Sequence, residues 1–267
     1  MKLSLHTEPE VPLEAEVICP DRLIGLSEAQ VAALPVSFGN RKASLGDFFS
    51  VSGKLNSTLE VTGDLSGVKY IGAAMTSGRV IVDGNVGLHV GAAMSGGEIE
   101  ITGNAGDWVG PEMSGGRIVI KGDAGHLVGA AIRGMRHGIL GGEIIVHGNA
   151  GNEIGNAMRR GLIAIGERCG DFAGAGLLAG TIVVLGELGA RAGAGMKRGS
   201  IVSMCGAELL PTFTYACAYR PAFLSQYLLY LRGLGLSIDD DYITGQYRRW
   251  SGDAIELNRG EILLYQT

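Results

Sequence analysis

The sequence lacks the features that define several large protein classes. None of its 267 residues falls in a run of about 20 apolar residues, the length that a membrane-spanning helix needs. The opening residues 1–8 turn polar at once, so we expect no secretory signal peptide. The net charge is −5, and no overall basic field favours nucleic acid. We therefore expect a cytoplasmic protein that binds neither membrane nor nucleic acid.

Residues that carry chemistry are few and scattered. The four cysteines include no Cys-x-x-Cys pair, which is typical of a cytosolic protein with reduced thiols; they are Cys19, Cys169, Cys205 and Cys217. We interpret Cys169 as a small core residue. The histidines at 6, 89, 126, 137 and 147 do not have metal-ligand spacing, and no phosphate-binding loop, dinucleotide fingerprint or His-Glu-x-x-His motif occurs. We expect no catalytic, cofactor or metal site in this chain.

Glycine, in contrast, is abundant and regularly spaced. One glycine recurs with a period of 19 residues, at Gly72, Gly91, Gly110, Gly129, Gly155, Gly174 and Gly193. A large apolar residue follows each of them after three positions, at Met75, Met94, Met113, Ile132, Met158, Leu177 and Met196. One step is 26 instead of 19, so we place a seven-residue insertion within 133–142. Such phasing excludes a flexible glycine linker.

Between the glycines stand short alternating stretches of β-branched residues, such as 98–102 and 117–121. Alternation predicts strands, and a fixed period near 20 residues predicts a solenoid. We predict an all-β chain with a right-handed parallel β-helix of about seven 19-residue turns over residues 63–206. The left-handed form is the rival, but it needs an aliphatic residue every six positions, which a period of 19 does not supply.

The flanking segments lack the repeat, and we interpret both as caps. A cap is needed because an uncovered end of a sheet exposes unpaired backbone groups. The N-terminal cap, residues 1–62, is predicted to contain a helix from Ser27 to Leu34 and strands at 3–5, 13–18, 45–52 and 55–61. The C-terminal cap, residues 207–267, is predicted to contain a helix at about 221–232 and strands at 247–250, 254–257 and 261–265.

The outward side of the later strands is apolar. A monomer rarely leaves such a strip exposed, so either the C-terminal segment or another protein chain must cover it. The residues of the strip are Ile145, Val183, Leu185, Val202 and Met204.

The corners after the apolar positions become basic in the later turns. The basic residues are Arg133, Arg136 and His137 in the insertion, and Arg159, Arg160, Lys197 and Arg198. These side chains are either ordinary solvated corners or a docking site for an acidic partner or a polyanionic ligand.

Three outward carboxylates, Glu98, Glu100 and Glu143, leave one catalytic alternative open. A polysaccharide lyase or hydrolase built on a β-helix needs paired carboxylates on one face. Charged residues that alternate along a strand more commonly only contact solvent.

Three segments of the repeat resemble a known family. Residues 84–91, 103–110 and 148–155 are similar to the repeats in the C subunit of formylmethanofuran dehydrogenase and of its bacterial counterpart, the formyltransferase/hydrolase complex. The flanking segments 248–253 and 258–262 also resemble the C subunit. A related repeat forms the C-terminal domain of the glutamate synthase large subunit, but there the β-helix belongs to a far longer chain.

The resemblance implies a structural subunit without an active site of its own. In the family, other subunits carry out the chemistry. The A subunit is amidohydrolase-like and contains metal, and the D subunit is a formyltransferase. The B subunit contains tungsto- or molybdopterin in the archaeal enzyme. The carrier of the formyl group is methanofuran, or methylofuran with a polyglutamate tail, and the bacterial complex takes the group from tetrahydromethanopterin. Whether the chain belongs to the bacterial hydrolase or to the archaeal redox enzyme stays open at this point.

Overall fold

The computed structural model describes residues 1–266 and is built mainly of strands, which confirms the predicted all-β class. One sheet has 13 strands, in the order β15-β16-β17-β14-β13-β12-β11-β10-β9-β8-β6-β1-β5, and a smaller sheet has the order β4-β3-β2-β7. The repeat supplies eight consecutive strands of the large sheet: β6 (Thr58–Thr62), β8 (Arg79–Asp83), β9 (Glu98–Ile101), β10 (Arg117–Ile120), β11 (Glu143–Val146), β12 (Leu162–Ile165), β13 (Thr181–Val184) and β14 (Arg198–Ser203).

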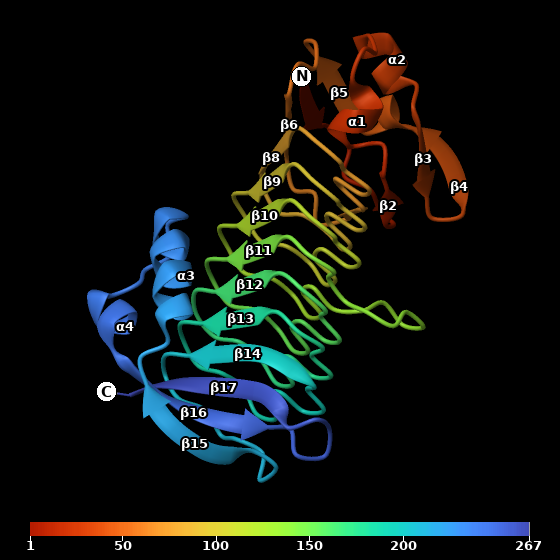
Figure 1. Cartoon of the computed structure of the whole chain (residues 1–267). Helices are drawn as coiled ribbons and strands as arrows, with labels where there is room; N and C mark the ends of the chain where they lie inside the picture. The colour runs from red at the N-terminus through yellow and green to blue at the C-terminus, as the bar shows by residue number, and fades with distance from the viewer. Residues whose placement is uncertain (267) are drawn as a thin grey trace.

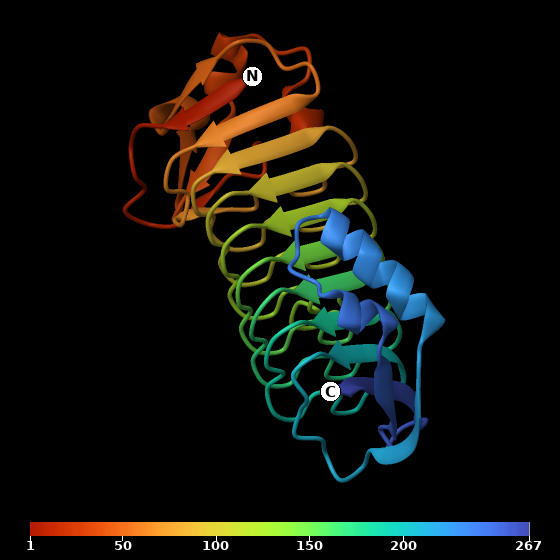
Figure 2. The same ribbon diagram turned by 90° about the vertical axis from the view of Figure 1, so that its left-hand side faces the viewer.

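These strands pair in parallel, and each pairs with its equivalent in the next turn. Ile99 of β9 lies beside Val80 of β8 and Ile118 of β10, in steps of one period. A second ladder of single parallel bridges runs from Leu65↔Val86 to Cys169↔Leu188. The chain therefore passes the same two ladders once in each turn, and the turns stack on one another along the molecule (Figures 1 and 2).

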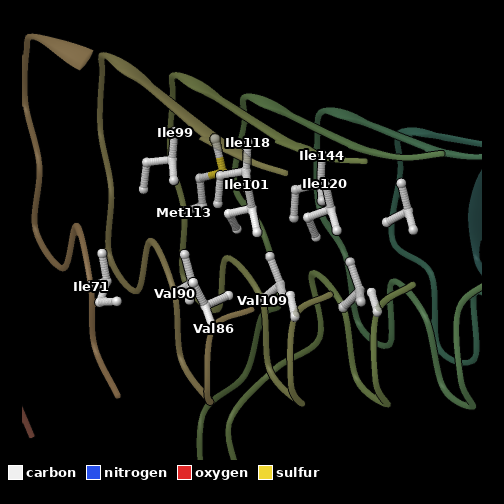
Figure 3. Close-up of a cluster of buried hydrophobic side chains, with 14 of the residues drawn as sticks. Ile71, Val86, Val90, Ile99, Ile101, Val109, Met113, Ile118, Ile120 and Ile144 are labelled. Carbon is white, nitrogen blue, oxygen red and sulfur yellow. The ribbon is translucent and has the colours of Figure 1, made fainter. Parts of the chain in front are cut away.

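Columns of identical or similar apolar side chains fill the interior of the turns. Ile99, Ile118 and Ile144 occupy equivalent places in successive turns, as Figure 3 shows, and each is fully buried. The column of large apolar residues that begins at Met75 is also fully buried. Each turn is covered only by its neighbours, which is the reason that a repeat of this kind needs several turns and a cap at each end.

Glycine is required in the recurrent column because of both its backbone conformation and the space around it. All seven glycines from Gly72 to Gly193 have positive φ, between 64° and 73°. A Cβ at Gly110 would lie 2.6 Å from Cδ1 of Ile144, so a side chain would collide with the interior column.

Asn and Asp side chains connect the turns on the outside. Asn85 Oδ1 accepts the Asn104 N–H at 2.9 Å, and Asn104 Oδ1 accepts the Asp123 N–H at 2.8 Å. The same pattern continues from Asp123 to Asn149 at 2.6 Å. These bonds satisfy backbone donors that the corners leave without a strand partner.

The insertion begins one residue earlier than predicted, and the apolar position of its turn is Ile139, not Ile132. The Ile139 N–H donates to the Gly129 carbonyl at 3.0 Å, just as the Met113 N–H donates to Gly110. Ile139 is fully buried, whereas Ile132 is only partly buried. Residues 132–138 form the loop that extends from the stack in yellow-green in Figure 1.

The N-terminal segment contains β1 (Lys2–Leu5), β2 (Leu13–Glu14), α1 (Pro20–Leu23), α2 (Glu28–Ala32), β3 (Pro35–Phe38), β4 (Arg41–Ser44), the 3-10 helix η1 (Leu45–Asp47), β5 (Phe49–Ser52) and, inside the first turn, β7 (Val68–Lys69). The predicted helix after Ser27 is present, with a capping box between Ser27 and Gln30. The strand predicted over 13–18 stops at Glu14, and the one over 45–52 begins with the 3-10 helix instead. The β3–β4 hairpin was not predicted.

The C-terminal segment contains β15 (Thr214–Tyr219), α3 (Ala222–Gly233), α4 (Asp240–Thr244), β16 (Gln246–Gly252) and β17 (Arg259–Gln266). β17 continues the parallel ladder beside β14, and β16 and β15 follow antiparallel to it. The strand predicted over 254–257 is wrong, because these residues form the turn between β16 and β17. β15 and α4 were not predicted.

The apolar strip on the late strands is covered by the C-terminal segment itself. Helix α3 lies across the outer face of the sheet (Figure 2). Its Leu224, Leu228 and Leu231 are buried in one cluster with strip residues such as Ile145 and Val183. The choice that the sequence left open between the tail and another chain is thus settled for these strands. Among residues 1–266, no helix is long and apolar enough to span a bilayer.

Candidate partner-binding surfaces

Side chains that could hold a metal ion are scattered over the part of the chain that the structure describes. Within the described residues 1–266, no group of three or more His, Cys, Asp or Glu side chains is arranged to hold a metal ion. Cys169 is fully buried, and burial raises the pKa of its thiol to about 12. This thiol stays protonated at neutral pH, which agrees with its predicted role in the core.

The three outward carboxylates of the sequence alternate with arginines from strand to strand. Glu100 pairs with Arg79, with Oε2 and Nη2 2.5 Å apart. Glu143 lies 3.1 Å from Nε of Arg117, whose Nη1 is 3.5 Å from Glu98. Each carboxylate therefore has a cationic partner, an arrangement that fits an ion-pair network better than a pair of catalytic acids.

This network extends to helix α3 through Tyr230. Arg117 Nη2 donates to the Tyr230 hydroxyl at 2.7 Å, and that hydroxyl donates to Glu143 Oε2 at 2.5 Å. Burial and the hydrogen bond to Glu143 raise the pKa of Tyr230. The cluster therefore adds a polar contact between α3 and the strands to the apolar contact made by the buried leucines of the helix.

An open groove with aromatic walls runs beside this junction. Phe223, Tyr227 and Tyr230 of α3 line it together with Glu143, and their exposed fractions are 39%, 37% and 37%. A second hollow shares Glu143 and Tyr227 with it and reaches Arg160 at the corner of the stack. The groove offers apolar faces, one carboxylate and one guanidinium to a neighbouring molecule.

The basic corner residues stack in register in the last turns. The N–H groups of Arg159 and Arg160 both donate to the Ile139 carbonyl, and those of Lys197 and Arg198 to the Leu177 carbonyl. The turn between these pairs carries Leu178 and Ala179 at the same corner.

One basic residue at this corner was missed. Arg259 of β17 pairs in register with Arg198 of β14, so Arg160, Arg198 and Arg259 belong to one column. The sequence pattern gave no signal for Arg259, because the tail strand that continues the ladder lies outside the repeat. We call Arg159, Arg160, Arg198 and Arg259 the basic corner.

The remaining predicted residues lie apart from this column or have a partner. Lys197 Nζ is 3.7 Å from Glu256 Oε2 in the β16–β17 turn. Arg133 and Arg136 lie in the extended loop 132–138, whose base returns to the stack at Ile139, next to Arg159. Exposed Met135 and Leu140 border the same loop. The structure thus joins two of the predicted pairs at one corner and leaves the loop arginines beside them.

Comparisons with known proteins agree with this architecture. The family model described as the GXGXG motif matches residues 84–207. A chain of the formyltransferase/hydrolase complex (FhcABCD) from Methylorubrum extorquens, solved with methylofuran, superimposes with a TM-score of 0.94 and is 34% identical, covering 100% of both chains.

Curated relatives match over shorter stretches. The C subunit of molybdenum-containing formylmethanofuran dehydrogenase 1 from Methanothermobacter thermautotrophicus is 45% identical over 81 residues, 30% of this chain and 20% of that protein. The C subunit of the tungsten-containing enzyme 2 from Methanothermobacter marburgensis is 42% identical over 92 residues, 33% of this chain and 34% of that protein. The matches to these relatives therefore span only a fifth to a third of their length.

Proposed function

We propose that this chain, which belongs to the family formed by the C subunits of the formyltransferase/hydrolase complex and of formylmethanofuran dehydrogenase, is a non-catalytic structural component of a bacterial formyltransferase/hydrolase complex. That complex moves a formyl group from tetrahydromethanopterin to methanofuran or methylofuran and releases formate. The observation that carries the proposal is the likeness over the whole length of both chains to one chain of the Methylorubrum extorquens complex. The similarity to the dehydrogenase subunits covers about a third of this chain.

Within this proposal the fold is a right-handed parallel β-helix over residues 63–206, with caps at 1–62 and 207–267. The one-period parallel register of β8 to β14 supports the helix, as does the second ladder of bridges through Ala105 and Ala124. The partners are the A, B and D subunits, which carry the chemistry. The metal and the methanofuran or methylofuran carrier belong to those partners.

The experiment that tests the assignment is co-purification of the full-length tagged chain from its native host. The proposal expects an amidohydrolase-like and a formyltransferase subunit in stoichiometric amounts. If the chain is recovered without either of them under conditions that preserve native complexes, the proposal is wrong.

The runner-up is the C subunit of a tungsten- or molybdenum-dependent formylmethanofuran dehydrogenase. The local identity of 45% to the corresponding subunit of the molybdenum enzyme favours it. Metal and pterin analysis of the purified assembly separates the two. The hydrolase proposal expects neither tungsten nor molybdenum with pterin, whereas the dehydrogenase contains one of these metals on its B subunit.

The second alternative, a stand-alone β-helix enzyme that acts on carbohydrate, has weaker support. Its candidate carboxylates Glu98, Glu100 and Glu143 each have an arginine partner. Cleavage of an acidic or neutral polysaccharide by the isolated chain, lost in Glu98→Gln or Glu143→Gln, would favour it over the structural role.

We also propose that the basic side chains contact a run of carboxylates, either on an acidic partner protein or on the polyglutamate tail of the carrier. They are Arg133, Arg136, Arg159, Arg160, Lys197 and Arg198, with Arg259 added from the register of β17. Four guanidinium groups at one corner of an acidic chain support the hypothesis.

Charge reversal tests this contact. Glutamate at Arg159, Arg160 and Arg198 should weaken assembly or carrier use, and the loss should grow at low salt, where like charges repel more strongly. Glutamate at Arg168, an exposed arginine away from this corner, is the matched control. Unchanged assembly and unchanged KM for the carrier in the triple variant would rule the contact out.

A further inference from the structure

A second column of glycines lies at the corner where the strands of the turns begin. Its members all have positive φ, between 83° and 109°, and each directly precedes a strand; they are Gly97, Gly116, Gly142, Gly161 and Gly180. Their carbonyl groups accept hydrogen bonds from the next turn, as that of Gly161 does from the Thr181 N–H at 3.1 Å. Within residues 1–266 their own N–H groups donate to no backbone acceptor, and each glycine is only half-buried. This corner therefore offers one backbone donor in each turn to a neighbouring molecule.

The column passes helix α3 at the second hollow, next to the aromatic groove. Arg160, Thr181 of β13 and Tyr227 of α3 line this hollow together with Gly161 and Gly180. Within the described residues Arg160 belongs to none of the ion pairs. The chain thus borders the hollow with a guanidinium, two hydroxyls and two backbone N–H groups, all of which can donate hydrogen bonds. We call these five residues the donor hollow.

One carboxylate, that of Glu143, also borders the donor hollow, but cationic and hydroxyl groups already compensate its charge. Nε of Arg117 lies 3.1 Å from Glu143 Oε2, and the Tyr230 hydroxyl donates to the same oxygen. Arg160 therefore supplies the positive charge that has no counter-ion among the described residues. A ligand with a single negative charge fits this balance of charges.

The surroundings of the donors favour a carboxylate that is attached to an apolar group. Guanidinium and backbone N–H groups bind carboxylate oxygens through charge-assisted hydrogen bonds, whereas sugar hydroxyls also need acceptors. The aromatic groove begins at Tyr227, which lines both hollows. The rings of Phe223 and Tyr227 lie edge to face, with centroids 6.2 Å apart. An apolar group next to the carboxylate would lie against these rings.

We propose that the donor hollow binds a carboxylate that carries an apolar or aromatic group. The carboxylate accepts hydrogen bonds from the Arg160 guanidinium and from the N–H groups of Gly161 and Gly180, and the apolar group packs on Tyr227 and Phe223. Such a carboxylate either ends a peptide of a neighbouring protein or belongs to a small aromatic acid. The inference goes beyond the proposed structural role, because it assigns a ligand site to this chain alone. It shares only Arg160 with the proposed contact to a run of carboxylates.

An NMR titration of the isotope-labelled full-length chain with phenylacetate and with N-acetylphenylalanine tests the site. The backbone amide signals of Gly161 and Gly180 should shift and saturate, with a dissociation constant on the order of 1 mM for ligands of this size. The neutral controls, phenylacetamide and N-acetylphenylalaninamide, should bind at least about tenfold more weakly, because they cannot form charge-assisted hydrogen bonds. Tighter binding of N-acetylphenylalanine than of phenylacetate would indicate a peptide end as the ligand, and the reverse order would indicate a small acid.

Substitutions at the donors locate the binding. Arg160→Gln removes the charge and should weaken binding of both acids at least about tenfold. The matched control is Arg159→Gln, because Arg159 is the neighbouring arginine of the basic corner but does not line the hollow; it should change the affinity by less than about twofold. Thr181→Val removes one hydroxyl and should weaken binding about two- to tenfold. Circular dichroism verifies that each variant is folded.

Several results would overturn the proposal. Glycine signals that do not move with either acid, or that move equally with the acids and their amides, contradict it. Equal losses in Arg159→Gln and Arg160→Gln would mean that the basic corner attracts anions without a defined site. Tighter binding of triglutamate than of N-acetylphenylalanine would assign Arg160 to the run of carboxylates instead. A chain that binds neither acid but still co-purifies with its partners would refute this inference and leave the structural role intact.

Discussion

The two ends of the stacked turns are closed in different ways. At the N-terminal end the segment before the repeat closes the interior, and its Leu13, Ile18 and Leu23 belong to the same buried cluster as the columns of the turns. At the C-terminal end Phe213 and Ile262 complete that cluster, but most of the segment folds back over the outer face. There α3 builds a second buried cluster, and the sheet continues to the free edge of β15.

The difference shows that covering the apolar interior of the last turn does not by itself cover the edge strand of the sheet. Both ends exclude water from the interior, because an uncovered last turn would expose apolar columns. At the N-terminal end the sheet edge is covered as well, because β5 packs against helix α2. At the C-terminal end β15 pairs only with β16 within residues 1–266. The C-terminal end combines an open edge, exposed aromatic side chains on α3 and the basic corner. It is therefore the end better suited to association.

The largest effect is expected where α3 covers the late strands. Leu228→Ala removes a fully buried side chain from the second cluster and should lower the free energy of unfolding by about 2–5 kcal/mol. Hydrogen exchange should be faster at the backbone amides of α3, whereas those of β11 to β14, which pair within the sheet, should stay protected. The neighbouring Leu229, 54% exposed, gives the control Leu229→Ala, expected within about 0.5 kcal/mol of wild type. Equal losses in both variants would mean that α3 does not pack as described.

A smaller loss of unfolding free energy is expected when Asp253 is replaced, whose carboxylate joins the C-terminal segment to the last turn. Asp253 is buried, and its carboxylate accepts the Gly195 N–H at 2.9 Å and the Ile255 N–H at 3.2 Å. Asp253→Ala leaves these donors without a partner and should cost about 1–3 kcal/mol, measured by urea unfolding. At the other end, Asp21 forms the comparable contact to Thr76 but is exposed. Asp21→Ala should therefore cost less, and the reverse order would contradict the comparison.

Acid should weaken the C-terminal closure through the same residue. Burial by itself would raise the pKa of Asp253, but the hydrogen bonds from the backbone N–H groups of Gly195 and Ile255 outweigh it and hold the pKa below its usual range. A depressed pKa stabilises the fold above the unfolded value, about 3.9, and this contribution is lost as pH falls through the folded value. Wild type should therefore lose more stability than Asp253→Asn when the pH is lowered from about 6 to about 3. Parallel curves for the two proteins would exclude this role.

The smallest effect is expected at the junction between α3 and the charged early strands. Tyr230→Phe removes the hydroxyl that joins Arg117 to Glu143 and should cost about 0.5–1.5 kcal/mol. The aromatic ring and the ion pair remain. A double-mutant cycle with Arg117→Ala measures the coupling, and additive losses would show that the three side chains do not act together.

The repeated turns could be predicted from the sequence because each turn needs a glycine at the same position, next to the interior column. Gly110 must leave space for Ile144, and its equivalents meet the same need in every turn. The position of the insertion was ambiguous, since Ile132 is one period after Met113 and Ile139 is one period before Met158. The hydrogen bond from Ile139 to Gly129 and the full burial of Ile139 decide between them.

The two ends were harder to predict because they occur once. β15 has no repeat to reveal it, and neither its pairing with β16 nor the register that brings Arg259 beside Arg198 leaves a local pattern. The apolar strip did predict that something covers the late strands, since Val183 and Val202 would otherwise face water. It did not identify the face of α3 that does so. The sequence singled out six basic residues as a contact surface, and that role stays a prediction; they are Arg133, Arg136, Arg159, Arg160, Lys197 and Arg198. The groove beside α3 was not predicted.

We propose that this chain contributes structure and not chemistry to its complex. The direct test is to measure formate release from a formylated methanofuran or methylofuran carrier by three samples: the purified chain, the partner proteins expressed without it, and the full assembly. If the chain has a structural role, we expect no release by the chain alone, loss of assembly in its absence, and activity only in the complete complex. Turnover by the isolated chain, or full activity and assembly of the partners without it, would contradict this role.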